Sequence, residues 1–276
     1  AVEAPTYLGA LTAFNPYQPQ YVSMAMDEQG LIPAALEEAL KNHPIKLVYL
    51  VPTFQNPTGR TLPVERRKQI AEIVQRYNVP LIEDDPYSAL RYRGEPVPPI
   101  QTFAPDHVIY AGTMSKTMAP GLRIGFAVAP ELLRHWMVLV KQGVDLHTST
   151  FTQALAAEYL AGGYLDRHLP KIIDLYRPRQ EAMLAALDSY LPAGFNWSQP
   201  EGGMFIWAEG PKGLDLVALY PKCVACKVAY VPGKFFYTEP DQGFATMRLN
   251  FTMSDPETIY KAIRLIAGVL SDALAG

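Results

Sequence analysis

Short apolar stretches alternate with amphipathic ones along the first half of the chain, and this alternation limits the folds that it can adopt. The apolar stretches cover residues 46–51, 79–84, 107–113 and 123–128, and the helical pattern of residues 62–77 lies between the first two. Strands that are separated by helices form parallel sheets, because each helix crosses from the end of one strand to the start of the next. The sequence therefore predicts an α/β domain with a mostly parallel central sheet and flanking helices.

Further helical segments follow this region. Residues 131–142 have the pattern of one more helix, and Gly162 with Gly163 ends the helix that precedes them. Residues 166–191 are predicted to form a long helix that connects two domains. Pro178 is expected to kink or offset this helix, because proline removes a backbone donor.

The last part of the chain has the pattern of a different domain. Strands are predicted at residues 195–197, 203–207, 228–231 and 247–251, and a helix is predicted at residues 256–274. Strands that are followed by a helix indicate a small α+β domain. We therefore expect a large domain over residues 1–165, and an interdomain helix with a small C-terminal domain over residues 166–276.

Composition is typical of a globular protein. Of the 276 residues, 49% are hydrophobic and 18% are charged, and the formal net charge of −3 gives no sign of a nucleic-acid surface on this segment. No apolar stretch approaches the length of a membrane span, and no charged-then-apolar leader opens the sequence. We expect no membrane partner, no nucleic-acid partner and, by default, a cytoplasmic location.

The chain has two cysteines, Cys223 and Cys226, in a Cys-x-x-Cys spacing. A zinc site needs two more ligands, and the five histidines show no paired ligand spacing. A redox pair is expected to open a helix after a strand, whereas these cysteines precede a predicted strand. We therefore predict no metal site and favour chance spacing over a redox pair, although any role of the two cysteines stays open.

One lysine lies in a setting that suits covalent chemistry. Lys116 has hydroxyl side chains at Thr113 and Ser115 and a guanidinium at Arg123, directly after a β-rich stretch at residues 107–110. An amine at such a site can condense with the aldehyde of pyridoxal phosphate, while hydroxyls and a fixed guanidinium hold the dianionic phosphate. The alternative interpretation of this segment alone is an exposed turn with a solvated lysine and arginine.

Three further segments favour the cofactor interpretation. Asn56 lies in a polar turn after the apolar stretch of residues 46–51, and Asp84 lies at the end of the next predicted strand. Ligands bind at the carboxyl ends of strands in open α/β sheets. Arg248 stands alone in the apolar stretch of residues 246–251, where a buried guanidinium needs a partner such as a substrate carboxylate.

These four segments together resemble the motifs of the fold-type I pyridoxal phosphate-dependent aminotransferases. The motifs are Asn-Pro-Thr-Gly from Asn56, Asp-x-x-Tyr from Asp84, the hydroxyl-x-Ser-Lys motif that ends at Lys116, and the late Arg248, and they occur in the family's order. The chain is most similar to the branch of class I and II enzymes that contains 2-aminoadipate and kynurenine aminotransferases. The resemblance implies a large cofactor-binding domain and a small C-terminal domain.

The resemblance implies catalytic roles for three residues. Lys116 would carry the cofactor as an aldimine and then move the proton between the substrate Cα and the cofactor C4′. Asp84 would keep the pyridine nitrogen protonated, and Tyr87 would hydrogen-bond the 3′ oxygen. The Asp-x-x-Tyr spacing selects Asp84 over Asp85, which is otherwise an ordinary cap or surface acid.

The remaining implied contacts are with the cofactor's ring, oxygen and phosphate. Tyr7 would stack on the ring, and Asn56 would donate to the 3′ oxygen and lie against the substrate. Thr113, Ser115 and Arg123 would bind the phosphate.

Other residues would bind or surround the substrate. Arg248 would bind the α-carboxylate of the substrate through a bidentate pair, although an interdomain salt bridge is the alternative. Gly202, Gly203 and Phe205 are expected to shape the wall of the substrate pocket. The resemblance also implies cis peptide bonds before Pro5 and Pro57.

The sequence begins at Ala1 inside a family motif, without an initiator methionine. By resemblance, we expect an N-terminal arm, a first sheet strand and a Gly-Ser-Gln-type phosphate loop to precede this point. The large domain is therefore expected to be N-terminally incomplete, and the 276 residues alone are expected to be a poor enzyme.

The expected function is a pyridoxal phosphate-dependent transaminase that moves an amino group from an amino acid to a 2-oxo acid, with 2-oxoglutarate as the expected acceptor. The family also implies a homodimer. Two alternatives stay open at this point: the aminotransferase-like effector domain of a MocR-type transcription regulator, and another reaction on the same fold, such as carbon–sulfur lysis. The sequence does not identify the preferred amino donor.

Overall fold

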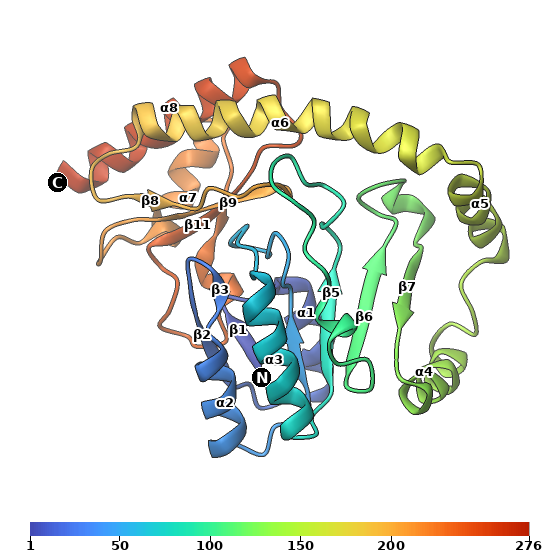
Figure 1. Cartoon of the computed structure of the whole chain (residues 1–276). Coiled ribbons are helices and arrows are strands. Elements are labelled where there is room, and N and C mark those ends of the chain that lie inside the picture. Colours follow the sequence, from blue (N-terminus) through green and yellow to red (C-terminus); the bar gives the residue numbers. More distant parts are fainter. Residues whose placement is uncertain (276) are drawn as a thin grey trace.

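The computed structural model describes residues 1–275 and contains two β-sheets (Figure 1). The larger sheet has the order β3-β2-β1-β4-β5-β6-β7. Its strands are β1 (Val2–Ala4), β2 (Ser23–Asp27), β3 (Gly30–Leu31), β4 (Val48–Leu50), β5 (Leu81–Asp85), β6 (Val108–Thr113) and β7 (Gly125–Val128). The five strands from β2 to β6 in this order are parallel, whereas β3 and β7 pair antiparallel at the two edges. The prediction of a mostly parallel sheet is confirmed.

Helices connect and cover the strands of the larger sheet. They are α1 (Leu8–Phe14), α2 (Pro33–Asn42), α3 (Val64–Arg76), α4 (Glu131–Val144) and α5 (Thr150–Ala161), with short 3₁₀ helices at Asn15–Tyr17, Ile100–Thr102 and Pro120–Leu122. α2 and α3 lie together on one face of the sheet (Figure 1). Ile70, Ile73 and Val74 of α3 are buried against the strands, as the 3.6-residue pattern predicts.

The smaller sheet forms the centre of the C-terminal part. Its order is β10-β11-β9-β8, and all of its pairs are antiparallel. The elements are α6 (Tyr164–Tyr190), β8 (Asn196–Trp197), β9 (Phe205–Glu209), α7 (Leu216–Ala225), β10 (Val231–Pro232), a 3₁₀ helix at Gly233–Phe236, β11 (Thr246–Asn250) and α8 (Pro256–Ala275). α6 runs along α8, and the two share a core with this sheet (Figure 1).

Two expectations for the C-terminal part differ from the structure. The strand predicted at residues 228–231 is reduced to the two residues of β10, and an unpredicted helix, α7, precedes it. Cys223 therefore lies inside a helix, and Cys226 lies just after it. Pro221 obscured this helix in the sequence, but Asp215 caps it by accepting from the N–H groups of its first turn.

The long helix α6 matches the predicted interdomain helix in extent. It runs without interruption through both Pro170 and Pro178, so Pro178 does not end it. The domain boundary between residues 165 and 166 stays a prediction. Among residues 1–275, no helix combines the length and the apolar character needed to cross a membrane.

The parallel strands bring four polar segments together at their carboxyl ends. Tyr7 follows β1, Asn56 follows β4, Asp84 lies at the end of β5 and Lys116 follows β6. These strands are neighbours and run in the same direction, so their carboxyl ends meet.

Candidate active site

A cavity of about 270 Å³ lies at the carboxyl ends of the parallel strands of the larger sheet. All eight residues that were predicted to bind the cofactor line it, and Val51, Pro86 and Pro120 complete its wall. The eight are Tyr7, Asn56, Asp84, Tyr87, Thr113, Ser115, Lys116 and Arg123. The structure therefore brings together side chains that are more than a hundred residues apart in the sequence.

The loop after β6 presents an amine, two hydroxyls and a guanidinium from one short segment. The Thr113 hydroxyl lies 3.0 Å from the Ser115 Oγ and accepts from the Ser115 N–H at 3.1 Å. Arg123 adopts a left-handed backbone with φ of 55°, and its Nη1 donates to the Pro120 carbonyl oxygen at 3.3 Å. Lys116 is half-buried between them. Such a set of donors suits a phosphate group.

Asp84 points its carboxylate at the cavity and is held by a residue that the sequence did not reveal. The Tyr49 hydroxyl, from β4, donates to Asp84 Oδ2 at 2.6 Å. Burial raises the pKa of Asp84, and the hydrogen bond from Tyr49 opposes that rise. Burial and the nearby Asp84 charge also raise the pKa of the Tyr49 phenol, so Tyr49 remains a donor.

Asp85 lies in a separate environment. Its carboxylate accepts from the Ser88 N–H at 2.9 Å and from the Tyr110 hydroxyl at 2.8 Å, and it lines a neighbouring cavity rather than this one. Successive side chains of a strand point to opposite faces, which separates the two acids. The geometry therefore favours Asp84 as the acid of the site.

Asn56 connects Tyr87 with Arg248. Its Nδ2 donates to the Tyr87 hydroxyl at 3.1 Å, and its Oδ1 accepts from Arg248 Nη1 at 2.8 Å. Asn56 is buried at the turn, and the peptide bonds before Pro5 and Pro57 are both cis, which confirms that expectation. The amide oxygen and nitrogen have different partners, so the side chain is fixed in one orientation.

Arg248 lies on β11 of the smaller sheet and reaches toward the cavity without lining it. Its guanidinium carbon lies 4.1 Å from the centre of the Phe205 ring and 5.0 Å from that of Phe236. Burial lowers the pKa of Arg248, and no carboxylate lies within ion-pair distance of it among residues 1–275. The alternative of an interdomain salt bridge is therefore not what the structure shows.

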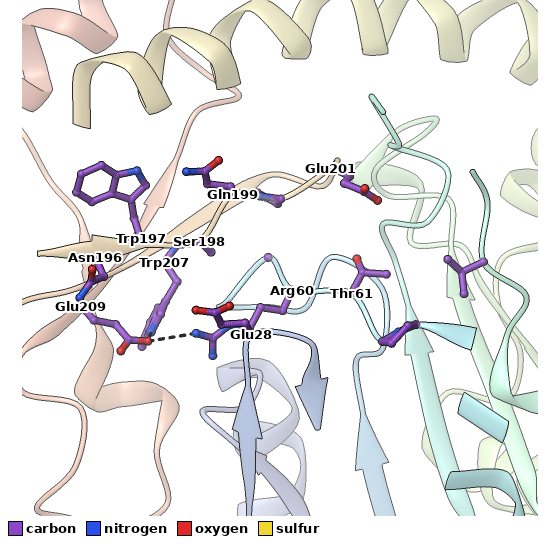
Figure 2. Close-up of a pocket in the computed structure, with 14 residues that line it drawn as sticks. Glu28, Arg60, Thr61, Asn196, Trp197, Ser198, Gln199, Glu201, Trp207 and Glu209 are labelled. Carbon is purple, nitrogen blue, oxygen red and sulfur yellow. Dashed lines mark hydrogen bonds and ion pairs between the residues drawn. The ribbon is translucent and has the colours of Figure 1, made fainter. Parts of the chain in front are cut away.

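A larger cavity, of about 890 Å³, lies beside the same turn but offers different chemistry (Figure 2). The segment of Trp197 and Glu201 forms one side, and Arg60 and Thr61 form the other. Arg60 forms an ion pair with Glu209 at 3.6 Å, so its positive charge already has a partner. Among residues 1–275, no lysine lines this cavity. We therefore assign the chemistry to the smaller cavity despite its size.

The side chains of the smaller cavity fit pyridoxal phosphate. Its donor set contains an amine for the aldehyde, a buried acid for the ring nitrogen, hydroxyls and a guanidinium for the phosphate, and an aromatic ring. The wall formed by Gly202 and Gly203 packs against Phe54, because a Cβ at either position would lie within 2.6 Å of that ring or its Cβ. Neither glycine lines the cavity, and the expectation that Gly202, Gly203 and Phe205 shape the wall of the substrate pocket stays a prediction.

Glu3 is a buried acid that the sequence did not mark as functional. It lies on β1 and is 1% exposed, and its Oε1 has no hydrogen-bond partner among the described residues. Burial raises its pKa to about 8, and hydrogen bonds from Val51 and Gln55 oppose that rise. Its carboxyl group therefore favours the protonated form over much of the neutral range.

The raised pKa of Glu3 predicts a pH dependence of stability that Glu3→Gln removes. Because the pKa is near 4.5 when unfolded and about 8 when folded, the free energy of unfolding falls as pH rises between these values and then levels. Each pKa unit corresponds to about 1.4 kcal/mol, so the expected fall is several kcal/mol. Urea unfolding of the wild type and of Glu3→Gln from pH 5 to 9 checks this. Parallel curves of the free energy of unfolding against pH would contradict it.

Comparisons with known proteins identify the family of the chain. The family model "Aminotransferase class I and II" matches residues 1–266. The chain is 46% identical to aromatic-amino-acid aminotransferase 1 of Thermococcus litoralis, with coverage of 99% of the chain and 67% of that protein. It is 38% identical to the 2-aminoadipate transaminase of Thermus thermophilus, with coverage of 99% and 70%.

Solved structures show the same fold. The multiple substrate aminotransferase of Thermococcus profundus superposes with a TM-score of 0.96 at 46% identity, and the match covers 99% of the chain and 69% of that structure. Family, fold and site chemistry agree. The chain therefore belongs to the class I and II aminotransferase family, and it is a transaminase of the pyridoxal phosphate-dependent type.

Proposed function

We propose that the chain transfers an amino group from an amino acid to 2-oxoglutarate, with Lys116 as its catalytic lysine. The observation that carries this proposal is the single cavity that all eight proposed cofactor-binding side chains line. When bound, pyridoxal phosphate supplies an aldehyde that takes up the amino group and a ring that accepts electrons. The protein's own residues then bind, orient and move protons.

Three side chains carry the proposed chemistry. The Lys116 amine would bind the cofactor aldehyde covalently and, once released, would move the substrate Cα proton. Asp84 would keep the ring nitrogen protonated, and Tyr49 fixes the Asp84 carboxylate for this task. Tyr87 and Asn56 would hydrogen-bond the 3′ oxygen, and Asn56 aligns the Tyr87 hydroxyl.

The other side chains hold the cofactor and the substrate. Thr113, Ser115 and Arg123 would bind the phosphate from one loop, and Tyr7 would cover the ring. Arg248 binds the α-carboxylate, since its guanidinium is buried and, among the described residues, has donors besides the one that Asn56 uses.

The names of the relatives suggest which donors to test. The relatives named above act on aromatic amino acids and on 2-aminoadipate, and a Pyrococcus horikoshii enzyme at 45% identity was solved with kynurenine as a substrate. We propose donors with aromatic or long acidic side chains. The regulator and carbon–sulfur lyase alternatives are not favoured, because relatives at 38–46% identity over nearly the whole chain are named aminotransferases.

A labelled amino group tests the proposed reaction. The protein with pyridoxal phosphate is incubated with ¹⁵N-phenylalanine, ¹⁵N-2-aminoadipate or ¹⁵N-kynurenine and with 2-oxoglutarate, and the products are analysed by mass spectrometry. We expect ¹⁵N-glutamate. Labelled ammonia without labelled glutamate would contradict the proposal and support a lyase.

We also propose that the chain forms a homodimer. Large apolar side chains are exposed on α4, including Leu132 at 68%, Trp136 at 56% and Val140 at 62%. Exposed apolar patches of this kind are typical of protein interfaces. Sedimentation at several concentrations is the test, and a monomer throughout would contradict the proposal. A cytoplasmic location stays a prediction.

Arg248→Ala is expected to raise KM for both the amino donor and the 2-oxo acid, because both present the same carboxylate. Loss of charge-assisted hydrogen bonds predicts an increase of about 10- to 100-fold. Arg248→Lys should recover little, because an ammonium cannot reproduce the planar fork or its contact with Phe205.

Arg60→Ala is the matched control for this measurement. Arg60 is a neighbouring arginine that lines the larger cavity (Figure 2). The KM values of Arg60→Ala should stay within about threefold of wild type, because the partly exposed pair of Arg60 with Glu209, at 3.6 Å, contributes little. A larger increase in KM for Arg60→Ala than for Arg248→Ala would place the substrate in the larger cavity.

A further inference from the structure

A chain of buried polar contacts joins the first strand to the turn that carries Asn56. Oε2 of Glu3, on β1, accepts from the Val51 N–H at 3.0 Å and from Gln55 Nε2 at 3.3 Å. Glu3 and Gln55 are each 1% exposed. Burying such groups is costly unless they are paired, so these contacts strongly constrain the positions of both segments.

Gln55 uses both ends of its amide. Its Nε2 also donates to the Pro5 carbonyl oxygen at 2.9 Å, and its Oε1 accepts from the Thr58 N–H at 2.8 Å and from the Thr58 hydroxyl at 2.7 Å. Pro5 lies two residues before Tyr7, and Thr58 lies two residues after Asn56. One side chain therefore ties together the two segments that bring Tyr7 and Asn56 to the cavity.

The position of the turn determines which hydrogen bonds Asn56 can make. The Asn56 amide accepts from Arg248 at one atom and donates to the Tyr87 hydroxyl at the other. These contacts cross from the larger sheet to Arg248 of β11 in the smaller sheet. A shift of the turn would therefore release the guanidinium of Arg248 from the orientation that the structure shows.

We propose that Glu3, acting through Gln55, is a positioning residue for substrate binding. It holds the Asn56 turn so that Arg248 keeps its remaining donors directed at the substrate carboxylate. Glu3 does not line the cavity, so its effect reaches the substrate only through these contacts. This inference rests on the proposed role of Arg248.

Two variants of Glu3 test whether its hydrogen-bond acceptor positions the Asn56 turn. Glu3→Ala leaves the Val51 N–H and one of the two Gln55 Nε2 hydrogens without an acceptor, whereas Glu3→Gln keeps a carbonyl oxygen in place. The readouts are KM and kcat for phenylalanine with 2-oxoglutarate, and the Kd of 3-phenylpropionate, an unreactive carboxylate, by calorimetry. For Glu3→Ala we expect KM and Kd to rise about tenfold with kcat within about threefold, and for Glu3→Gln we expect values near wild type.

Glu83 is the matched structural control. It lies on β5, is also 1% exposed, and accepts from the Ile100 and Gln101 N–H groups at 2.9 Å each. Glu83→Ala should lower the thermal midpoint as Glu3→Ala does, yet leave KM and Kd within about twofold of wild type. Ile100 and Gln101 lie outside the Asn56 turn, and Arg67, the ion-pair partner of Glu83 at 3.7 Å, keeps its own hydrogen bonds to Pro52 and Thr53. Equal increases for both variants would overturn the inference.

A double variant tests the route of the effect. If Glu3 acts through Arg248, Glu3→Ala should change Kd by less than about twofold in an Arg248→Ala background. An additive tenfold increase would overturn the inference. Should Glu3→Ala fail to fold, Gln55→Met takes its place, because it preserves the bond between Glu3 and Val51.

The outcomes distinguish this inference from the proposed function. If Arg248→Ala raises Kd but neither Glu3→Ala nor Gln55→Met does, the positioning role is wrong and the proposed function stands. If Arg248→Ala leaves the Kd of 3-phenylpropionate unchanged, the proposed carboxylate site itself is wrong.

Discussion

The Lys116→Ala variant is expected to lose transamination by at least about 10⁴-fold, because general base catalysis alone contributes about 10²–10⁴-fold and the covalent hold on the cofactor is lost as well. Lys116 is the lysine that lines the cavity, half-buried between the hydroxyls and the guanidinium of its loop. Half-reaction rates with phenylalanine, followed by absorbance, measure the loss. Both the donor and the acceptor half-reactions should fail.

Lys46→Ala is the control for this experiment. Lys46 is exposed just before β4 and lies outside the cavity, so its rates should stay within about twofold of wild type, as for most exposed substitutions. A Lys116→Ala protein that folds, binds the cofactor and retains more than about a tenth of the wild-type rate would contradict the assignment.

Asp84→Asn is expected to reduce kcat/KM by about 10²- to 10⁴-fold, because removing one partner of a buried charge pair typically costs about 3–5 kcal/mol. Asp84 faces the cavity and is fixed by Tyr49. Asp85→Asn changes the same charge one residue away, where Tyr110 and Ser88 use the carboxylate. It should cost less than about tenfold.

Two results for Asp84→Asn and Asp85→Asn would contradict the assignment of Asp84. Equal losses, or a greater loss for Asp85→Asn, would mean that the Asp-x-x-Tyr spacing was assigned in the wrong register. Tyr49→Phe adds a second check, because it removes the hydrogen bond at 2.6 Å and retains the ring. We expect an intermediate loss of about tenfold, as for one hydrogen bond to a charged group.

Local spacing and the family resemblance together predicted most of the site. Lys116, Thr113, Ser115 and Arg123 lie within one short segment, so their spacing favoured a phosphate and aldehyde site over an exposed turn. The resemblance then assigned the roles of the residues in the more distant segments. The parallel sheet was also predictable, because apolar strands and amphipathic helices alternate, as for residues 62–77 and α3. These features depend on neighbours in the sequence.

The residues that were missed depend on pairing between distant segments. Tyr49 reaches Asp84 because β4 pairs with β5 in the register of Tyr49 with Ile82, which no local pattern specifies. Glu3 resembles an ordinary exposed acid, but β1 is buried between β2 and β4. The helix α7 was missed because Pro221 interrupts its pattern.

Reductive labelling tests the central claim most directly, namely that the cavity of Lys116 holds the cofactor. The protein is incubated with pyridoxal phosphate, reduced with borohydride, digested and mapped by mass spectrometry. We predict a phosphopyridoxyl group on Lys116 and on no other lysine, with the label absent from Lys116→Ala. A label on another lysine, or an equal label in the variant, would contradict the account.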